Sequence, residues 1–315
     1  MAGNRDYNFE RYLSAKKAID DTALNHNVLD RLKAHLPQSS RSSPLHILEL
    51  GSGIGTMVER LVEWGLVQWV DYTAIDADEA ITRSAGGRLE RWSQEHGYKI
   101  AGDSPGRASI QSSACQISIT FECADVHQYF EIQSGKKQWD LGVAHAFMDL
   151  VDPAETVPRF CQLIKPGGLI YLTLNYDAET VLLPPVDYSF DEKIMRLYNK
   201  SMDTRQFRGK KTGDSRAGRH LLLHLRQAKA EILAAGSSDW VVFPGSNGYT
   251  KDESYFLHFI VHTIFKELNG HASVDRRRLN SWADQRHAQV EKGELIFIAK
   301  QMDMLARISG VRHSQ

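Results

Sequence analysis

Polar side chains that bind ligands recur at the ends of short apolar runs in the first half of the chain. Glu49, Asp76, Asp125, His145 and Asn175 each end or follow such a run. Carboxylates at these places can accept charge-assisted hydrogen bonds from hydroxyl and amino groups. Histidine and asparagine can donate or accept hydrogen bonds to hold a ligand. Five polar residues at equivalent places therefore predict one shared site.

The first of these acids opens a turn with three glycines at alternate positions. The residues are Glu49-Leu50-Gly51-Ser52-Gly53-Ile54-Gly55, with an apolar run before them and a helical pattern directly after them. This order predicts a buried strand, a tight turn and the first residues of a helix. Glycine lets the backbone adopt positive φ and approach a ligand closely. The turn is therefore expected to bind part of a ligand.

The spacing of the glycines excludes two common ligands. A dinucleotide site needs G-x-G-x-x-G, whereas the third glycine here comes one residue too early. A phosphate-binding loop of the G-x-x-x-x-G-K-[ST] type needs a lysine that this turn lacks. The turn fits neither pattern.

The run from Glu49 to Gly55 instead resembles the E/D-x-G-x-G-x-G motif of class I S-adenosylmethionine (SAM) dependent methyltransferases. Asp76, 21 residues beyond Gly55, matches the acid that binds the ribose hydroxyls in that family. Ala124-Asp125-Val126 resembles the segment beside the adenine edge. Trp139-Asp140-Leu141 matches the start of the fourth strand, and Lys165-Pro166-Gly167-Gly168 matches the turn before the fifth. The resemblance covers residues 45–176.

The resemblance implies SAM as the cofactor and assigns a role to each residue of the motif. Asp76 would accept bonds from the ribose hydroxyls and Asp125 from the adenine amino group, while Glu49 would lie near the ammonium. We expect the cofactor to contact Glu49, Gly51, Ser52, Gly53, Gly55, Asp76, Ala77, Asp125, Val126 and His145.

Methyl transfer from a sulfonium depends on proximity and alignment more than on acid–base groups. Candidates for contact with the reacting atoms follow the fourth and fifth strands and include Asp149. Aromatic rings can stabilise the sulfonium through cation–π contact. We expect Tyr176 to contact the substrate. The full set of candidate catalytic residues is Tyr176, Asn175, His145, Phe147 and Tyr12.

Strands that alternate with helices must position these residues. They predict an α/β fold with a seven-stranded, mostly parallel sheet and helices on both faces, as in class I methyltransferases. The strand ends then meet at one rim, where such sheets bind ligands. The expected strands are Ile47–Leu50, Val70–Ile75, Ile117–Cys123, Trp139–Ala144, Leu169–Leu174, Trp240–Phe243 and Glu294–Ala299. Residues 97–116 are interpreted as a surface insertion, and Leu221–Ala235 as one helix.

Four segments are expected along the chain. Residues 1–44 form a helical arm, 45–176 the SAM-binding core, 177–218 a substrate-lid insertion, and 219–315 the rest of the sheet with a cap helix at 253–268. The arm, the insertion and the cap helix would form a lid that excludes water and suits a small or medium-sized substrate.

The composition limits the partners. The chain has 315 residues, 42% hydrophobic and 24% charged, with a formal net charge of −1. This balance predicts no general attraction to nucleic acid or anionic membrane. Three cysteines without a CxxC pair favour a reducing, cytoplasmic compartment. No metal site is expected, and the apolar helix at Tyr255–Leu268 would be core or the contact of a homodimer.

Two other functions use the same cofactor site. The protein could cyclise or cleave SAM itself and release methylthioadenosine, or it could bind SAM without turnover. The acceptor atom of a methyltransferase stays open at this point.

Overall fold

The computed structural model describes residues 7–104, 106–113, 115–135, 138–207 and 209–309. The first six residues of the expected arm and residues 310–315 therefore lie outside the described residues. The helices are α1 Phe9–Ala23, α2 His26–His35, α3 Thr56–Glu63, α4 Glu79–Glu95, α5 Val126–Gln133, α6 Pro153–Leu163, α7 Tyr188–Thr204, α8 Ala217–Gln227, α9 Lys251–Leu268 and α10 Arg276–Glu291. The strands are β1 Leu45–Leu50, β2 Trp69–Asp76, β3 Lys99–Ser104, β4 Arg107–Gln111, β5 Gln116–Cys123, β6 Trp139–His145, β7 Ile164–Leu183, β8 Gln206–Phe207, β9 Lys210–Lys211, β10 Ala230–Ser237, β11 Trp240–Val242 and β12 Ile296–Ile308.

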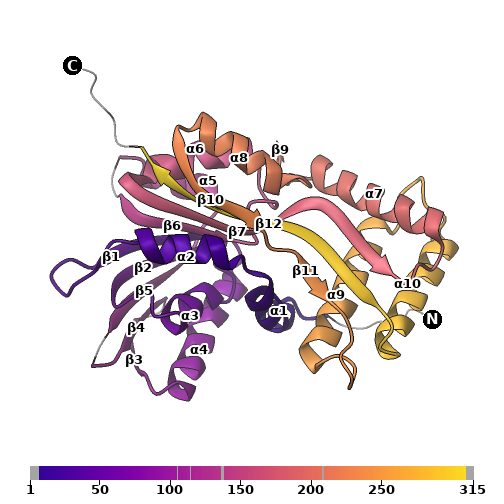
Figure 1. The fold of residues 1–315 in the computed structure, drawn as a ribbon, viewed down its shortest axis with the longest axis horizontal. Coiled ribbons are helices and arrows are strands. Elements are labelled where there is room, and N and C mark those ends of the chain that lie inside the picture. Colours follow the sequence, from indigo (N-terminus) through magenta and orange to yellow (C-terminus); the bar gives the residue numbers. More distant parts are fainter. Residues whose placement is uncertain (1–6, 105, 114, 136–137, 208, 310–315) are drawn as a thin grey trace.

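A single large sheet runs through the molecule (Figure 1). Its order is β10-β12-β7-β6-β1-β2-β5-β4-β3, and β11 also pairs with β12. The central strands β5, β2, β1, β6 and β7 are parallel, whereas the strands added at both edges are antiparallel. The predicted α/β class is confirmed. The predicted strand number is wrong, because the sheet has ten strands rather than seven.

Two segments account for most of the extra strands. Residues 97–116 are not a surface insertion, because β3 and β4 form a hairpin that pairs with β5 and extends the sheet. The expected helix Leu221–Ala235 ends at Gln227, and β10 begins three residues later. Lys229 takes a positive φ of 60° at this break, and the following residues pair with β12. Pairing with a neighbouring strand has outweighed the helical propensity of the alanines.

The strands β7 and β12 are longer than expected, with 20 and 13 residues. They pair antiparallel over their length, with Leu169 opposite Arg307 at one end and Leu183 opposite Ile296 at the other, and they extend beyond the parallel sheet. In Figure 1 this two-stranded ribbon reaches to the right, where α7, α9 and α10 surround it. The extension places these helices next to the C-terminal ends of the parallel strands.

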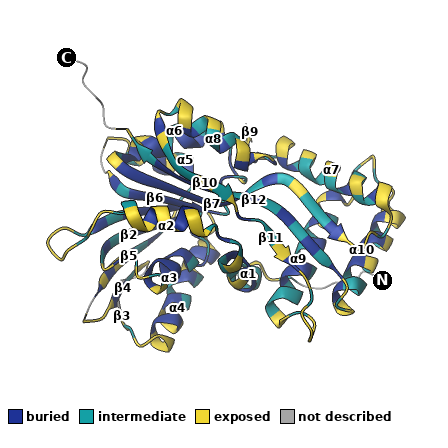
Figure 2. Ribbon diagram, viewed as in Figure 1, coloured by how far each residue is buried: buried dark blue, intermediate teal, exposed yellow. Residues whose placement is uncertain are grey.

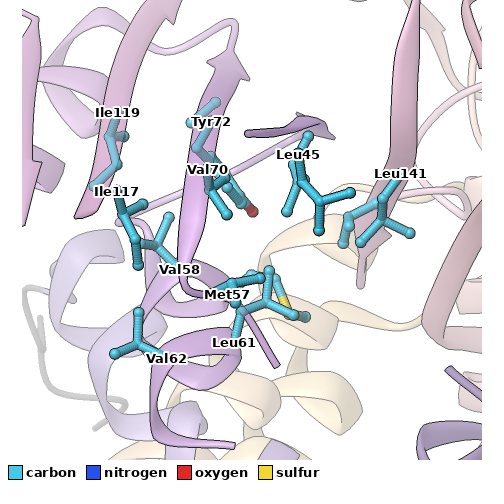
Figure 3. Packing of buried hydrophobic residues seen from close by; sticks show 14 of the residues in the cluster. Leu45, Met57, Val58, Leu61, Val62, Val70, Tyr72, Ile117, Ile119 and Leu141 are labelled. Atoms are coloured by element: carbon cyan, nitrogen blue, oxygen red, sulfur yellow. The ribbon is translucent and has the colours of Figure 1, made fainter. Parts of the chain in front are cut away.

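Three apolar clusters hold the elements together, and the central strands β1, β2 and β6 are mostly buried (Figure 2). One face of the sheet packs on α2, α3 and α4, and Figure 3 shows Met57, Val58 and Leu61 of α3 against strand residues. The other face packs on α5, α6 and α8. The third cluster joins α1, α7, α9 and α10 to the extension. The arm breaks between α1 and α2, where Asn25 accepts a hydrogen bond from the amide of Val28 and begins α2.

None of the described helices combines the length and the apolar character needed to cross a bilayer.

Candidate active site

A cavity of about 990 Å³ lies at the C-terminal ends of β1, β2 and β6, where α1, α7 and α9, three helices of the expected lid, also line it. Apolar side chains dominate its wall, with a few polar groups among them, as in most small-molecule sites. The core contributes Glu49, Gly51, Ser52, Gly53, Asp76, Ala77, Asp125, Val126, His145 and Phe147. The three helices contribute Tyr12, Tyr198 and Phe259, and the strands β7 and β11 contribute Tyr176 and Trp240. Residues of both predicted sets therefore share one space.

The glycine turn has the conformation that its sequence predicts. Gly51, Gly53 and Gly55 have φ values of 65°, 53° and 80°. A Cβ atom at Gly51 would lie 2.1 Å from Cδ2 of Phe147, so the ring of Phe147 occupies the space of a side chain there. Ser52 donates its amide to the carbonyl of Ile75 at 2.9 Å. Gly55 begins α3 and does not line the cavity, so its role is conformational.

Asp76 closes the turn from the next strand. Its Oδ2 accepts a hydrogen bond from the amide of Gly53 at 2.9 Å, and its Oδ1 accepts one from the amide of Asp78 at 2.9 Å. Burial raises the pKa of Asp76, although these backbone bonds work in the opposite direction. A carboxylate has about four lone-pair positions, so two remain for a ligand.

Glu49 is 1% exposed and lies beneath the turn. Tyr72 donates its hydroxyl to Oε2 of Glu49 at 2.8 Å. Burial raises the pKa of Glu49 to about 8, against the bond from Tyr72 and the positive charge of Arg60. Glu49 is therefore mostly protonated at neutral pH until a cation approaches it.

Asp125 is the N-cap residue of α5. Its Oδ1 accepts hydrogen bonds from the amides of His127 and Gln128 at 3.0 and 3.2 Å. Its side chain therefore caps a helix and also lines the cavity. Val126 and Ala77 lie on the same wall and give it an apolar surface.

His145 reaches the cavity wall, but both of its ring nitrogens already have partners. Nδ1 lies 2.7 Å from Oγ1 of Thr173, and Nε2 lies 3.1 Å from Oδ2 of Asp20 and 3.1 Å from Nη1 of Arg60. Burial and the charge of Arg60 lower the pKa of His145 to about 4, in spite of the bond to Asp20. The ring is neutral and fixed, which suits contact with a ligand better than proton transfer.

The partners of His145 belong to a buried network that the sequence did not reveal. Asp20 of α1 is 1% exposed and pairs with Lys16 at 2.6 Å, with Arg60 of α3 at 3.4 Å, and with the indole of Trp240 at 3.0 Å. Burial alone would raise the pKa of Asp20, but Lys16, His145 and Arg60 hold it well below its usual value. The network attaches the arm to the core and to β11.

Aromatic rings from two helices form the far wall. Tyr12 of α1 stacks on Phe259 of α9 with a centroid distance of 4.0 Å and an angle of 15°. It also stacks on Phe256 at 5.8 Å. Burial raises the pKa of Tyr12 well above its usual value. The arm and the cap helix therefore close the cavity together.

Of the two candidate catalytic residues on β7, Tyr176 points into the cavity and Asn175 does not. Tyr176 lines the cavity, donates its hydroxyl to Oδ1 of Asn199 at 2.9 Å and lies 3.0 Å from Oγ1 of Thr180. Burial raises its pKa to about 12. Asn175 was expected at the end of a strand, but β7 continues through it. Its Nδ2 donates to the carbonyl of Met302 at 2.8 Å, and it does not line the cavity.

Asp149, in the loop after β6, is a half-buried acid in the cavity wall. Burial raises its pKa to about 6, against its own backbone amide and the charges of Lys16 and Arg205.

The backbone at this rim takes unusual conformations. Ala146 and Leu174 have φ values of 49° and 52°, and both line the cavity. The amide of Ala146 donates to the carbonyl of Thr173 at 2.8 Å, and that of Leu174 to Oδ1 of Asp303 at 2.7 Å. Strained residues held by such bonds cluster at functional sites.

Some solved structures are similar to this chain at low sequence identity. No protein-family model matches the chain, and no curated protein is similar to it in sequence. A candidate methyltransferase from Bacillus halodurans is 14% identical with a TM-score of 0.48, covering 91% of this chain and 100% of that one. Geranyl diphosphate C-methyltransferase from Streptomyces coelicolor is 10% identical with a TM-score of 0.45, covering 97% and 87%.

A SAM-dependent methyltransferase from Thiobacillus denitrificans, in complex with S-adenosylhomocysteine, is 13% identical with a TM-score of 0.41, covering 94% of this chain and 97% of that one. At these identities and scores the function has to be inferred from the residues of this chain.

Proposed function

We propose that the protein binds SAM and transfers its methyl group to a small or medium-sized molecule in the same cavity. The observation that carries this proposal is the continuity of that cavity. Gly51, Gly53 and Asp76 line one part of its wall, and Tyr12 and Phe259 of the lid line another. A cofactor on the turn and a substrate under the lid would therefore meet in the same cavity.

The residues present fit SAM. The ring of Phe147 packs directly on Gly51, so this glycine makes room for the ring, while the backbone at Gly53 lines the cavity where the methionine part would pass. Asp76 keeps two acceptor positions for the ribose hydroxyls, because each oxygen accepts one backbone bond. The hydroxyl of Ser52 is buried without a partner among the described residues. Glu49 offers a carboxylate to an ammonium.

When bound, SAM supplies a methyl group on a positively charged sulfur. The chain has to hold the acceptor in line with that group and keep water away. Phe147, between the turn and the lid, offers an aromatic face to the sulfonium. His145 fixes the arm beside the cofactor through Asp20. The mostly apolar cavity and the net charge of −1 favour a small molecule over nucleic acid as substrate.

The products of SAM distinguish the three candidate functions. The purified protein is incubated with SAM alone and then with a panel of acceptors, and the nucleoside product is identified. S-adenosylhomocysteine that forms only with an acceptor supports methyl transfer. Methylthioadenosine from SAM alone would identify a cyclase or lyase, and binding without any product would identify a binding protein.

The cofactor site has its own test. Asp76→Ala should weaken SAM binding by about 1.5 kcal/mol or more, since hydrogen bonds to a charged group contribute about that much. Isothermal titration calorimetry measures the affinity. Asp71→Ala is the matched control, because Asp71 lies on the same strand, is half exposed and does not line the cavity. Equal affinity in both variants would refute the site.

A further inference from the structure

We propose that Asp149 accepts the proton of the atom that is methylated, and that this atom is a hydroxyl oxygen or an ammonium nitrogen of the substrate. The inference rests on the proposed methyl transfer and adds to it the chemical class of the acceptor.

The chain places Asp149 between the cofactor turn and the lid. A tight turn follows β6. It is closed by a hydrogen bond from the amide of Leu150 to the carbonyl of Phe147 at 2.9 Å, so Asp149 lies in the same turn as Phe147. The ring of Phe147 covers Gly51, and Asp149 lies two residues further on in the same cavity wall. Asp149 is therefore next to the place where the methyl group would be offered.

The carboxylate of Asp149 has no hydrogen bond or ion pair to another described residue. The three acids that would hold SAM, by contrast, already accept hydrogen bonds from the protein. Glu49 is bonded to Tyr72, Asp76 to two amides and Asp125 to the start of α5. The carboxylate of Asp149 thus keeps its capacity to accept a proton from a ligand.

The groups that face Asp149 come from several elements. Its negative charge helps to raise the pKa of Tyr12 of α1, Tyr176 of β7 and Tyr198 of α7, so all three hydroxyls are near it. Lys16 and Arg205 lower its pKa, and Asp214 raises it. Lys16 is held by Asp20, and Asp214 by His220 at 2.6 Å.

Burial raises the pKa of Asp149 by more than Lys16 and Arg205 lower it, so the pKa is about 6. At pH 7.5 the group is ionised and able to take a proton, and a base of this strength suits neutral pH.

The lid segment before α8 fixes the backbone of Asp149. The amide of Asp214 donates to the carbonyl of Asp149 at 3.1 Å, and the amide of Thr212 donates to that of Arg205 at 2.9 Å. Between them, a Cβ at Gly213 would lie 2.8 Å from the carbonyl oxygen of Met202. The loop is therefore packed closely against α7, and the backbone of Asp149 is held in one place.

The step balances as a simple transfer. The acceptor oxygen or nitrogen forms a bond to the methyl carbon. The bond from that carbon to sulfur breaks, and its electron pair stays on sulfur. The acceptor's proton passes to a carboxylate oxygen of Asp149 and then to water, and an ammonium gives up this proton first, because its nitrogen has no lone pair until then. No oxidant, reductant or metal is needed.

The first test compares Asp149→Asn with Asp152→Asn. Asp152 begins α6, a place where asparagine serves equally well, and it does not line the cavity. A panel of phenols, primary amines and alkenes is offered with SAM, and the methylated atom is identified by mass spectrometry. Asp149→Asn should lower kcat/KM by about 100-fold or more at pH 7.5. The wild-type activity should also fall below pH 6, and this limb should be absent from the variant.

The second test needs no turnover. 2-Phenylethylamine and phenylacetate are titrated by calorimetry into wild type and both variants loaded with S-adenosylhomocysteine. The wild type and Asp152→Asn should prefer the amine about tenfold at pH 7.5, and the preference should fall below pH 6 as Asp149 is protonated. Asp149→Asn should lose the preference and still bind SAM within twofold of the wild type.

Methylation at carbon alone, equal kcat/KM in the two variants, or the same ligand preference in all three proteins would overturn the role of Asp149. If no panel member is methylated, the ligand preference decides. Failure to bind SAM, or release of methylthioadenosine from SAM alone, would refute the proposed function instead, so the two failures are distinguishable.

Discussion

Replacing Glu49 with glutamine should abolish a proton release that accompanies SAM binding at neutral pH. Burial raises the pKa of Glu49 to about 8 in the free protein. At pH 7, about nine-tenths of the molecules then carry a proton on this group. An ammonium beside Glu49 favours the ionised form. If binding lowers the pKa below about 6, roughly 0.8 proton is released per SAM bound at pH 7.

The same group affects the stability of the free protein. Between pH 4.5 and 8 the folded protein keeps a proton that Glu49 loses in the unfolded chain. Its contribution to stability is therefore greatest below pH 4.5 and declines as the pH rises, at up to about 1.4 kcal/mol per pH unit. Glu49→Gln cannot ionise, so its free energy of unfolding should fall less between pH 5 and pH 8.

Calorimetry in buffers of different ionisation enthalpy measures the released protons, because the observed binding enthalpy changes linearly with that of the buffer. The slope should be near 0.8 in the wild type and near zero in Glu49→Gln. Tyr72→Phe provides a second comparison. It removes the hydroxyl that lowers the pKa of Glu49, so the release at pH 8 should increase. Equal slopes in wild type and Glu49→Gln would refute the placement of the ammonium beside Glu49.

Two further substitutions test the turn and the rim. Gly51→Ala should weaken SAM binding by about tenfold or more in calorimetry, because its Cβ would displace the ring of Phe147 from the cavity wall. Gly97→Ala is its control, since Gly97 has a φ of 74° and open space around it, and an equal loss there would contradict the prediction. Asp303→Asn should lower the free energy of unfolding by about 1–3 kcal/mol in urea titrations, because Asp303 accepts from the buried amide of Leu174 and the half-buried amide of Asn25. Unchanged unfolding would show that neither amide depends on the carboxylate.

The parts of the site that local patterns determine could be predicted from the sequence. Gly51, Gly53 and Asp76 belong to one strand–turn–helix unit and the strand beside it, and the structure places them on one cavity wall. The α/β class followed in the same way, because alternating strands and helices are visible as separate runs. Periodicity suffices wherever an element's neighbours are near in sequence.

The parts that distant contacts determine were missed. The alanine-rich residues of β10 have helical propensity, and only pairing with β12 makes them a strand. Asn175 followed an apolar run that seemed to end, yet β7 continues because β12 pairs with it. Asp20 of the arm has the spacing of a solvated helix residue, but its partners Arg60 and His145 lie 40 and 125 residues away. No local signal marks such contacts.

The ribbon of β7 and β12 also limits how this protein can be divided or recombined. Both strands pass without interruption from the cofactor half to the lid half, so no linker separates the two. A fragment that ended at residue 176 would stop in the middle of β7 and leave the edge of the sheet unpaired, which favours aggregation. Exchange of substrate specificity with a related protein should therefore proceed through α7, α9 or the arm, with the ribbon left intact.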